Sequence, residues 1–344
     1  MKVARLYRAH DLRVEEEAPP GPPGPGEVQV RMKVVGVCGS DVHYYSEGRI
    51  GSAVVEAPLI MGHEPAGIIG AVGGGVDHLR VGQRVAVEPA RSCGRCEPCR
   101  EGHPNLCPEV RFFGTPPVDG AYREWVNVPA SNVFPLPDTL SDVEGALLET
   151  LGIGLHAVDL SHLRAGQTVA VFGTGPVGLA ALAVARAAGA ARLFAVDLLP
   201  PRLEVARRLG ADVAVVAGET DPVAAIWEAT GGRGVDVALE AAGAAETPQQ
   251  CAEVVKIGGT LVIIGIPADD TLSFQHATVR RKGLTIKLCR RMKHTYPRAI
   301  ALVASGRIDL KPLVTHVFPL ERIREAFDLV EGYRDGVVKA VIEI

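Results

Sequence analysis

The spacing of hydrophobic residues changes near residue 150. From Gln167 onward, short apolar runs alternate with stretches of helical periodicity, as expected when buried parallel strands are joined by helices. Strands are predicted at 168–172, 192–196, 213–216, 235–239, 260–264 and 284–288, and helices at 176–188 and 200–209. Six strands with crossover helices favour a doubly wound α/β sheet.

The residues before about 150 show another pattern. Short strands such as 27–34 and 65–72 are separated by Gly and Pro, with little helical periodicity, so this part is predicted to be mostly β. After about residue 290 the pattern predicts a helix at 296–305 and strands at 314–318 and 337–344. We therefore expect domains at 1–150 and 151–288, with 289–344 returning to complete the first.

Composition narrows the function classes. The 344 residues are 47% hydrophobic, enough to bury two cores without disulfides. The net charge is −4 and the pI is near 6.2, with scattered Lys and Arg, which argues against nucleic acid as a partner. The chain shows neither an 18-residue apolar run nor an apolar leader after Met1, so we expect a cytoplasmic protein without membrane partners.

Four cysteines form a C-x2-C-x2-C-x7-C cluster, at positions Cys93, Cys96, Cys99 and Cys107. Four thiolates on short spacers can close a tetrahedron around Zn²⁺ with no open position, which is typical of a structural site. The alternative is two disulfides. Such frameworks are typical of short secreted chains, so the cluster favours a metal.

A glycine-rich loop follows the strand predicted at 168–172 and opens the next predicted helix. It reads Gly173-x-Gly175-x-Val177-Gly178. In this context the glycines permit a tight turn and let a pyrophosphate approach the free N–H groups of the helix. The loop therefore predicts a dinucleotide site, with Gly265 and Ile266, after the fifth strand, as further contacts.

The residues after the second strand bear on which dinucleotide binds. Asp197 lies 19 positions beyond Gly178, where an acid would bond the adenosine ribose and repel a 2′-phosphate, so NAD is favoured over NADP. Arg202 follows closely. It either covers the adenine or attracts a 2′-phosphate, or else it is a solvated helix residue.

Three zinc-binding residue types, Cys38, His63 and Glu64, precede the cysteine cluster. The run from Gly62 to Val76, GHE-x2-G-x5-G-x2-V, resembles the zinc signature of the medium-chain alcohol dehydrogenases, and the whole chain is similar to that superfamily. The stretches 38–45, 48–51, 115–120 and 311–316 resemble its sorbitol and xylitol dehydrogenase branch.

This resemblance implies a GroES-like, partly open β-barrel with an inserted zinc lobe at about 88–110, a Rossmann domain, and a homotetramer. It also implies a catalytic zinc held by Cys38 and His63. Glu64 is expected as a direct ligand, and Glu149 either as a direct ligand or through a water, and the two carboxylates can exchange. Thr150 stands where the family usually has proline.

The resemblance also implies roles around that metal. Ser40 and His43 correspond to a proton relay, with Glu149 as the competing acceptor. Tyr44, Glu149 and Arg291 match substrate contacts, and Phe113 is either a wall of the site or a core residue. The chain departs from the polyol pattern at 290–294, where Met292 replaces a tyrosine and positive charge is added.

The leading hypothesis is an enzyme that oxidises a secondary alcohol of sorbitol, xylitol or a similar polyol to the ketose, with NAD and two zinc ions per chain. The alternatives are a threonine 3-dehydrogenase, a butanediol or other secondary alcohol dehydrogenase of the same superfamily, and a non-catalytic NAD-binding protein. Retention of the zinc-binding residues argues against the last.

Overall fold

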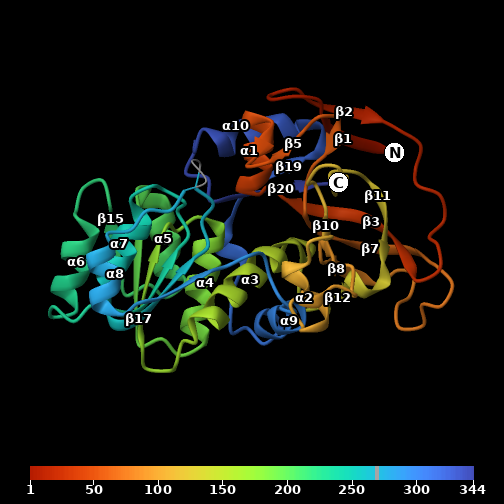
Figure 1. Cartoon of the computed structure of the whole chain (residues 1–344). Helices are drawn as coiled ribbons and strands as arrows, with labels where there is room; N and C mark the ends of the chain where they lie inside the picture. Colours follow the sequence, from red (N-terminus) through yellow and green to blue (C-terminus); the bar gives the residue numbers. More distant parts are fainter. Residues whose placement is uncertain (268–270) are drawn as a thin grey trace. The chain divides into compact units, whose positions relative to one another are not determined.

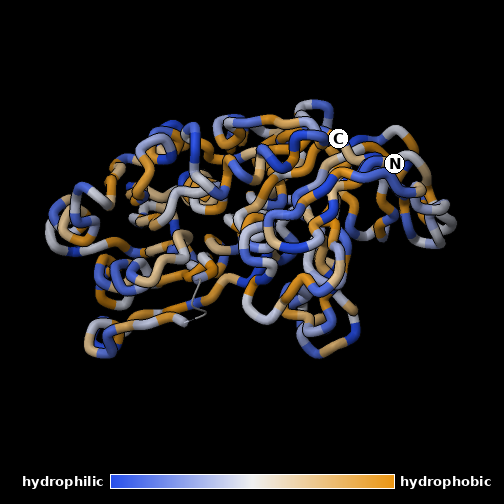
Figure 2. Tube along the Cα trace, turned by 90° about the horizontal axis from the view of Figure 1, so that it is seen from above, coloured by the Kyte–Doolittle hydropathy of each residue, from blue (hydrophilic) through white to orange (hydrophobic). Residues whose placement is uncertain are grey.

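The computed structural model describes residues 1–267 and 271–344, and the chain divides into two units. The first comprises Met1–Glu149, Tyr296–Ala304 and Val314–Ile344, and the second comprises Thr150–Thr295 and Ser305–Leu313 (Figure 1). Each has its own buried apolar cluster. Hydrophobic stretches run along the inner parts of the trace, whereas many outer turns are hydrophilic (Figure 2).

The first unit is built around the long strand β3 (Glu27–Gly36). Val28, Val30 and Met32 alternate into the core, as the period-2 pattern of a half-buried strand requires. The strand order is β12-β8-β7-β3-β20-β19. The bounds of the other five are β12 Val133–Pro135, β8 Arg84–Val87, β7 Glu64–Val72, β20 Lys339–Glu343 and β19 Val314–Pro319.

The sheet branches at β3. Its first half pairs with β11 (Trp125–Pro129) and its last residues pair with β20, so the sheet divides and curves as in a partly open barrel. The smaller strands are β1 Lys2–Leu6, β2 Leu12–Glu16, β4 Arg49–Ile50, β5 Ala53–Val54, β6 Leu59–Ile60, β9 Ala90–Arg91 and β10 Arg111–Phe112.

Helix α1 (Gly39–Glu47) is a feature that the hydrophobic pattern did not reveal. It begins after Cys38, whose N–H donates to Asp41 Oδ2 at 3.3 Å, and it ends at Gly48 with φ 71°. The other helices of this unit are α2 Glu97–Arg100, α9 Tyr296–Ala304 and α10 Ile323–Glu331, and α3 Asp142–Ser161 begins here. Short 3₁₀ turns lie at Pro104–Leu106, Ala130–Asn132 and Leu320–Arg322.

The second unit contains a six-stranded parallel sheet with the order β15-β14-β13-β16-β17-β18. Its strands are β13 Thr168–Phe172, β14 Arg192–Asp197, β15 Val213–Val216, β16 Val235–Glu240, β17 Val255–Ile263 and β18 Thr285–Leu288. Its helices are α4 Pro176–Ala187, α5 Pro200–Arg208, α6 Pro222–Ala229, α7 Thr247–Val254 and α8 His276–Lys282, and a 3₁₀ turn lies at Lys311–Leu313. The predicted doubly wound fold is confirmed.

The order of this sheet reverses between β13 and β16. In open parallel sheets, ligands bind at the carboxyl ends of the strands beside such a reversal. The ends of β13, β14 and β16 are therefore the first place to look for a ligand site.

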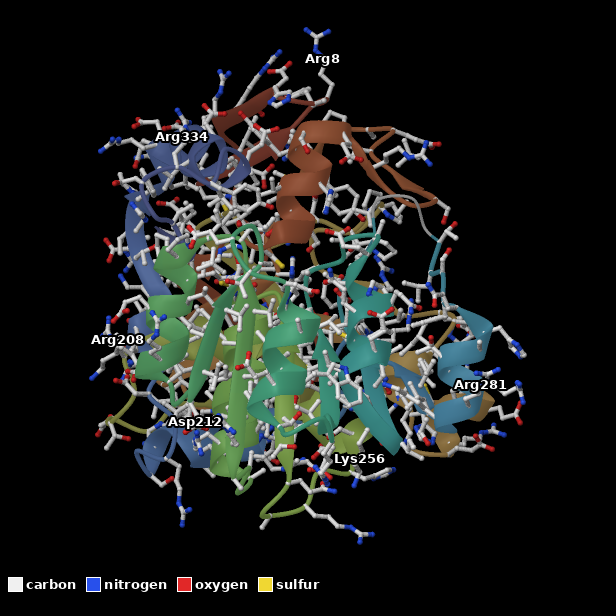
Figure 3. The ribbon with its side chains drawn as sticks, turned by 90° about the vertical axis from the view of Figure 1, so that its left-hand side faces the viewer. Arg8, Arg208, Asp212, Lys256, Arg281 and Arg334 are labelled. Atoms are coloured by element: carbon white, nitrogen blue, oxygen red, sulfur yellow. The ribbon has the colours of Figure 1, made fainter. Side chains whose placement is uncertain are left out.

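Many charged side chains lie on the surface of the fold, although a few, such as Glu64 and Lys339, are buried. Figure 3 shows Arg8 and Arg281 pointing outward, and the Arg8 side chain is 83% exposed. Within the described residues, none of the helices has the length and apolarity needed to cross a bilayer.

Candidate functional site

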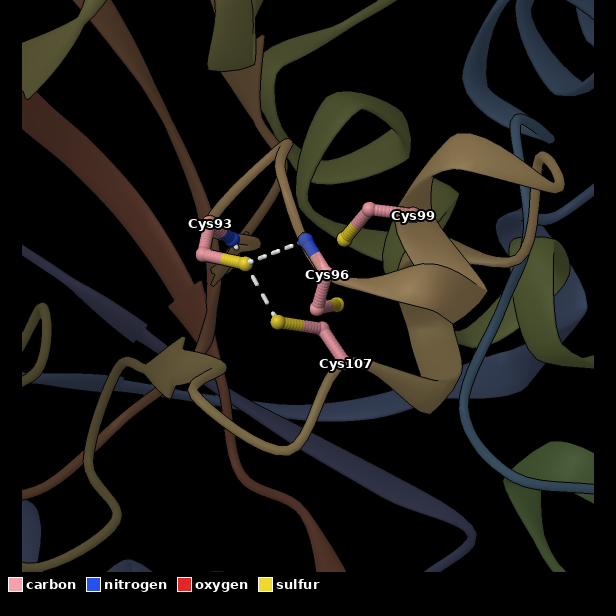
Figure 4. Close-up of side chains that lie close together, drawn as sticks. All are labelled: Cys93, Cys96, Cys99 and Cys107. Atoms are coloured by element: carbon pink, nitrogen blue, oxygen red, sulfur yellow. Dashed lines mark hydrogen bonds between the residues drawn. The ribbon is translucent and has the colours of Figure 1, made fainter.

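The four cysteines of the lobe converge. Cys93, Cys96, Cys99 and Cys107 are free thiols whose sulfur atoms lie within 4.8 Å of one another (Figure 4). The backbone N–H groups of Arg95 and Cys96 lower the pKa of the Cys93 thiol to about 6, which favours the thiolate that binds a metal. The all-sulfur donor set fits a closed tetrahedral zinc site better than two disulfides.

A second cluster joins residues from separate parts of the first unit. Cys38 precedes α1, His63 precedes β7, and Glu64 is the first residue of β7. One ligand atom of each lies within 4.8 Å of the others. His63 and Glu64 are buried and Cys38 is half-buried. One sulfur, one imidazole and one carboxylate fit zinc, and three protein ligands leave a position for substrate.

Gly62 makes this cluster possible. Its φ is 89°, a conformation that side chains disfavour, and a Cβ atom there would lie 2.9 Å from the Tyr122 ring. The turn brings His63 and Glu64 to one side, although neighbouring residues of an extended strand point to opposite faces.

Asp41, a residue that was not predicted from the sequence, contacts His63 of the cluster. It is 1% exposed, and Oδ1 lies 3.2 Å from His63 Nδ1. Oδ2 accepts hydrogen bonds from Tyr122 Oη and the Cys38 N–H, both at 3.3 Å. Burial disfavours a charge on His63, but Asp41 and Cys38 more than offset this and raise its pKa. Such a carboxylate fixes the tautomer and orientation of a metal-binding imidazole.

Lys339 is a second residue that the sequence analysis missed. It lies in β20, and its Nζ is 2.6 Å from Glu64 Oε1 and 2.5 Å from Oε2. Both side chains are 1% exposed. Gly36 leaves room for the pair, because a Cβ atom there would overlap Glu64 Oε2. Glu64 therefore carries its own buried counter-charge.

Glu149 ends the first unit within α3 and is 2% exposed. Its pKa is raised to about 7, chiefly by burial: His63 and Lys339 lower the pKa, whereas the nearby Glu64 raises it. Glu149 thus lies in the electrostatic field of the cluster, but it is not one of the three residues whose ligand atoms meet.

The residues expected beside the catalytic metal lie on or near α1. Ser40 and His43 are half-buried, and His43 Nδ1 lies 3.3 Å from Glu47 Oε1. Tyr44 is buried in the core of this unit. Phe113 packs partly buried against the same core, whereas its neighbour Phe112 has its ring 5.3 Å from that of His63.

The glycine-rich loop has the form of an anion site. Helix α4 begins after Gly175 with Pro176 in its first turn and no side-chain cap, so its first N–H groups remain free for a ligand. A Cβ atom at Gly178 would overlap the Gly173 carbonyl. Val177, in the same turn, is half-buried. The loop fits a pyrophosphate.

Asp197 ends β14 and turns toward this loop. Its Oδ2 accepts hydrogen bonds from Thr174 N at 2.6 Å and from Thr174 Oγ1 at 3.0 Å, and Oδ1 accepts one from Leu199 N. Arg202 Nη1 lies 4.0 Å from Asp197 Oδ2. Arg202 therefore pairs with the acid instead of pointing into solvent.

Gly265 and Ile266 follow β17, close to the loop after β16. A Cβ atom at Gly265 would overlap the Gly243 N–H, and Ile266 is 59% exposed. Arg291 belongs to the second unit and has a positive φ of 55°. Met292, beside it, is 4% exposed.

Comparisons with known proteins agree with this arrangement. The family described as "Alcohol dehydrogenase GroES-like domain" matches residues 24–138, and the one described as "Zinc-binding dehydrogenase" matches residues 176–305. Together they cover more than half of the chain.

Curated relatives match over nearly the full length. Sorbitol dehydrogenase of Bacillus subtilis is 42% identical over 342 residues, covering 99% of this chain and 97% of the relative. A probable D-xylulose reductase A of Aspergillus terreus is 40% identical, covering 95% of this chain and 94% of the relative.

Solved structures share the whole fold. An Escherichia coli alcohol dehydrogenase complexed with NADH is 29% identical with a TM-score of 0.92, and covers 100% of this chain and 99% of its own. The 2R,3R-butanediol dehydrogenase of Bacillus subtilis is 34% identical with a TM-score of 0.89 and the same coverage. The chain therefore belongs to the zinc-binding dehydrogenase family with an alcohol dehydrogenase GroES-like domain.

Proposed function

We propose that the protein oxidises a secondary alcohol of a polyol such as sorbitol or xylitol to the ketose, with NAD and a catalytic zinc ion. The main support is the 42% identity to a sorbitol dehydrogenase over 99% of the chain. The second support is the cluster in which ligand atoms of Cys38, His63 and Glu64 lie close together. That cluster argues against a non-catalytic NAD-binding protein.

The residues of this chain divide the work around the metal. Zinc, when bound, lowers the pKa of a coordinated hydroxyl, and NAD accepts the hydride. Cys38, His63 and Glu64 would hold the ion, while Asp41 keeps the imidazole of His63 in place at 3.2 Å. Lys339 fixes both oxygens of Glu64.

Glu149 is suited to proton transfer near neutral pH. A carboxyl with its pKa raised to about 7 is protonated and deprotonated with similar ease there. We assign it the competing role of proton acceptor, beside the relay through Ser40 and His43. Glu64 is already paired with Lys339, so the metal would compete with that lysine for Glu64. We therefore keep the proposal that Glu149 and Glu64 can exchange as ligands. Tyr44 and Arg291 stay predicted substrate contacts.

The cofactor proposal rests on Asp197. Its carboxylate lies at the end of β14, where the adenosine ribose is recognised in this fold. Arg202 lies 4.0 Å from this carboxylate, so the positive charge of the arginine is partly neutralised and attracts a 2′-phosphate less strongly. We therefore propose NAD over NADP. Equal rates with both cofactors at matched concentration would contradict this.

The substrate is tested by initial rates of NADH formation by the zinc-loaded protein. The panel is sorbitol, xylitol, ribitol, arabinitol, threonine, ethanol and butane-2,3-diol. We expect kcat/KM to be highest for one or more sugar alcohols. Activity confined to threonine, ethanol or the diol would contradict the polyol proposal and point to the departure at 290–294 as its reason.

The resemblance also predicts a homotetramer, and this stays a prediction. Sedimentation velocity of the zinc-loaded protein at micromolar concentration would test it. A single species of four chains is the expected result, and a monomer at all concentrations is the contrary one.

A further inference from the structure

Glu240 is a buried carboxylate outside both cysteine-containing clusters. It is the last residue of β16 and 1% exposed. Its Oε1 accepts hydrogen bonds from Ala242 N at 2.9 Å, Gly243 N at 2.8 Å and Thr247 Oγ1 at 2.7 Å. All three donors are uncharged. Among the described residues, the ion pairs do not include Glu240, in contrast to Glu64 with its lysine.

The position of Glu240 is the carboxyl end of the strand that borders the reversal of strand order. It pairs in register with Phe172, the last residue of β13. A dinucleotide in such a sheet spans the crevice beside the reversal. Asp197 at the end of β14 marks the adenosine side, so the nicotinamide half belongs on the opposite side, over β16 and β17.

Three loops lie close together here, and the hydrogen bonds of Glu240 reach two of them, the loops after β16 and β17. A Cβ atom at Gly173, in the loop after β13, would lie 2.5 Å from Ala242 N. Gly243 is held equally close to the loop after β17, because a Cβ atom there would lie 2.6 Å from the Ile266 carbonyl. The backbone carbonyl of Glu240 also accepts hydrogen bonds from Ile264 N at 2.7 Å and from Gly265 N at 3.0 Å.

Burying a carboxylate without a cation is costly, and its charge acts on what lies nearby. The thiol of Cys251 in α7 shows this: burial raises its pKa, and the charge of Glu240 raises it further. Because the described residues contain no ion pair with Glu240, a cationic group brought to the loops around it would gain an electrostatic attraction that is not already satisfied.

We propose that Glu240 is a positioning residue that builds the nicotinamide side of the cradle and raises the affinity for NAD⁺ relative to NADH. The oxidised nicotinamide ring carries a positive charge that the reduced ring lacks. The pyrophosphate and both riboses are the same in the two forms, so their interactions with Glu240 cancel in the ratio of affinities. A charge that favours the oxidised ring would also favour the dissociation of NADH after the hydride has been transferred.

The size of the effect follows from Coulomb's law. Two unit charges roughly 10 Å apart at an effective dielectric near 20 change an affinity by about tenfold. Removing the charge of Glu240 should therefore change the ratio of the two dissociation constants by that order.

The test is Glu240→Gln in the zinc-loaded protein, with dissociation constants for NAD⁺ and NADH measured by calorimetry without substrate. The variant keeps the shape and an acceptor oxygen. We expect NAD⁺ to bind about tenfold more weakly relative to NADH. The matched control is Thr247→Val, which removes one donor but leaves the charge. It should weaken both forms alike and leave the ratio unchanged.

A ratio within twofold of the wild-type value in Glu240→Gln overturns the proposal, as does an equal shift in Thr247→Val. If Glu240→Gln does not fold, Glu240→Asp decides, because it keeps the charge and must keep the ratio. The inference rests on the NAD site of the proposed function but not on its substrate. A protein that oxidises no polyol yet shows the shift would leave this inference standing and remove only the polyol.

Discussion

The two clusters of metal-binding residue types differ in where their members come from and in what surrounds them. The four cysteines lie within fifteen residues of sequence, from Cys93 to Cys107, and three are only half-buried. The Cys38, His63 and Glu64 cluster draws on two separate segments and is supported by Asp41 and by Lys339 from the far end of the chain. The first cluster is formed by one short segment of the chain, whereas the second requires the folded core to bring its residues together.

A structural and a catalytic metal site can be distinguished on this basis. Four thiolates need no help from elsewhere because they complete the coordination by themselves. A three-residue site with an open position needs its ligands oriented and their charge balanced by other side chains. If this division holds, variants at the two sites and at their supporting residues should differ in the following ways.

The largest effect is expected from His63→Ala. Losing one of three ligands should lower kcat/KM for the best polyol by at least about a thousandfold, on the order of the loss seen when a principal catalytic group is removed. His78→Ala, at an exposed histidine, is the control and should leave the rate unchanged. Substantial activity in His63→Ala would remove this cluster from the chemistry.

Lys339→Met should expose the cost of an uncompensated buried carboxylate. Removing one partner of a buried ion pair destabilises a protein by about 3 kcal/mol. If zinc binds at Glu64, the ion replaces the lost charge, so the drop in melting temperature should be larger in chelator-treated than in zinc-loaded protein. An equal drop in both states would mean that Glu64 does not meet the metal.

Asp41→Asn keeps the size of the side chain but weakens its hold on His63. Loss of such an outer partner lowers metal affinity by about 10- to 100-fold. Competition with a chromophoric chelator measures this for one of the two zinc ions, and the lobe zinc should be unaffected. Asp138→Asn, at an exposed position, serves as the matched control. Weakening of both ions together would contradict the separation of the sites.

The smallest effect concerns Glu88, at the start of the lobe segment. Burial raises its pKa to about 7, above the 4.3 of an unfolded chain. A raised carboxyl pKa means that the folded state holds the proton more tightly, so stability falls as pH rises from about 4.5 through 7. Glu88→Gln should remove about 1–2 kcal/mol of this fall. Melting curves between pH 5 and 8, with exposed Glu101→Gln as control, would show it.

The strands of the Rossmann unit were predicted closely because strands buried on both faces of a parallel sheet consist of short apolar runs. Strand β13 was predicted at 168–172 and lies at Thr168–Phe172, while β17 begins earlier than expected, at Val255 instead of 260. Helix α1 was missed because Gly39–Glu47 is mostly polar and carries little apolar periodicity. Its start depends on a bond between Cys38 and Asp41.

The support around the metal could not be predicted for a different reason. Lys339 stands in an apolar strand pattern, and only the pairing of β20 with β3 brings it beside Glu64. Likewise, Phe112 and not Phe113 lies against His63, because the side chains of neighbouring residues point in different directions. Such partners come from tertiary contacts that spacing along one chain does not record.

The most direct test of the two-site account is zinc content and polyol oxidation measured together in three proteins: wild type, Cys38→Ser and Cys99→Ser. We predict two zinc ions per chain in the wild type and one in each variant. Cys38→Ser should lose oxidation, and Cys99→Ser should retain it while folded and melt at lower temperature. Two zinc ions per chain in Cys38→Ser would contradict the account. So would a folded Cys99→Ser that has lost oxidation while Cys38→Ser retains it.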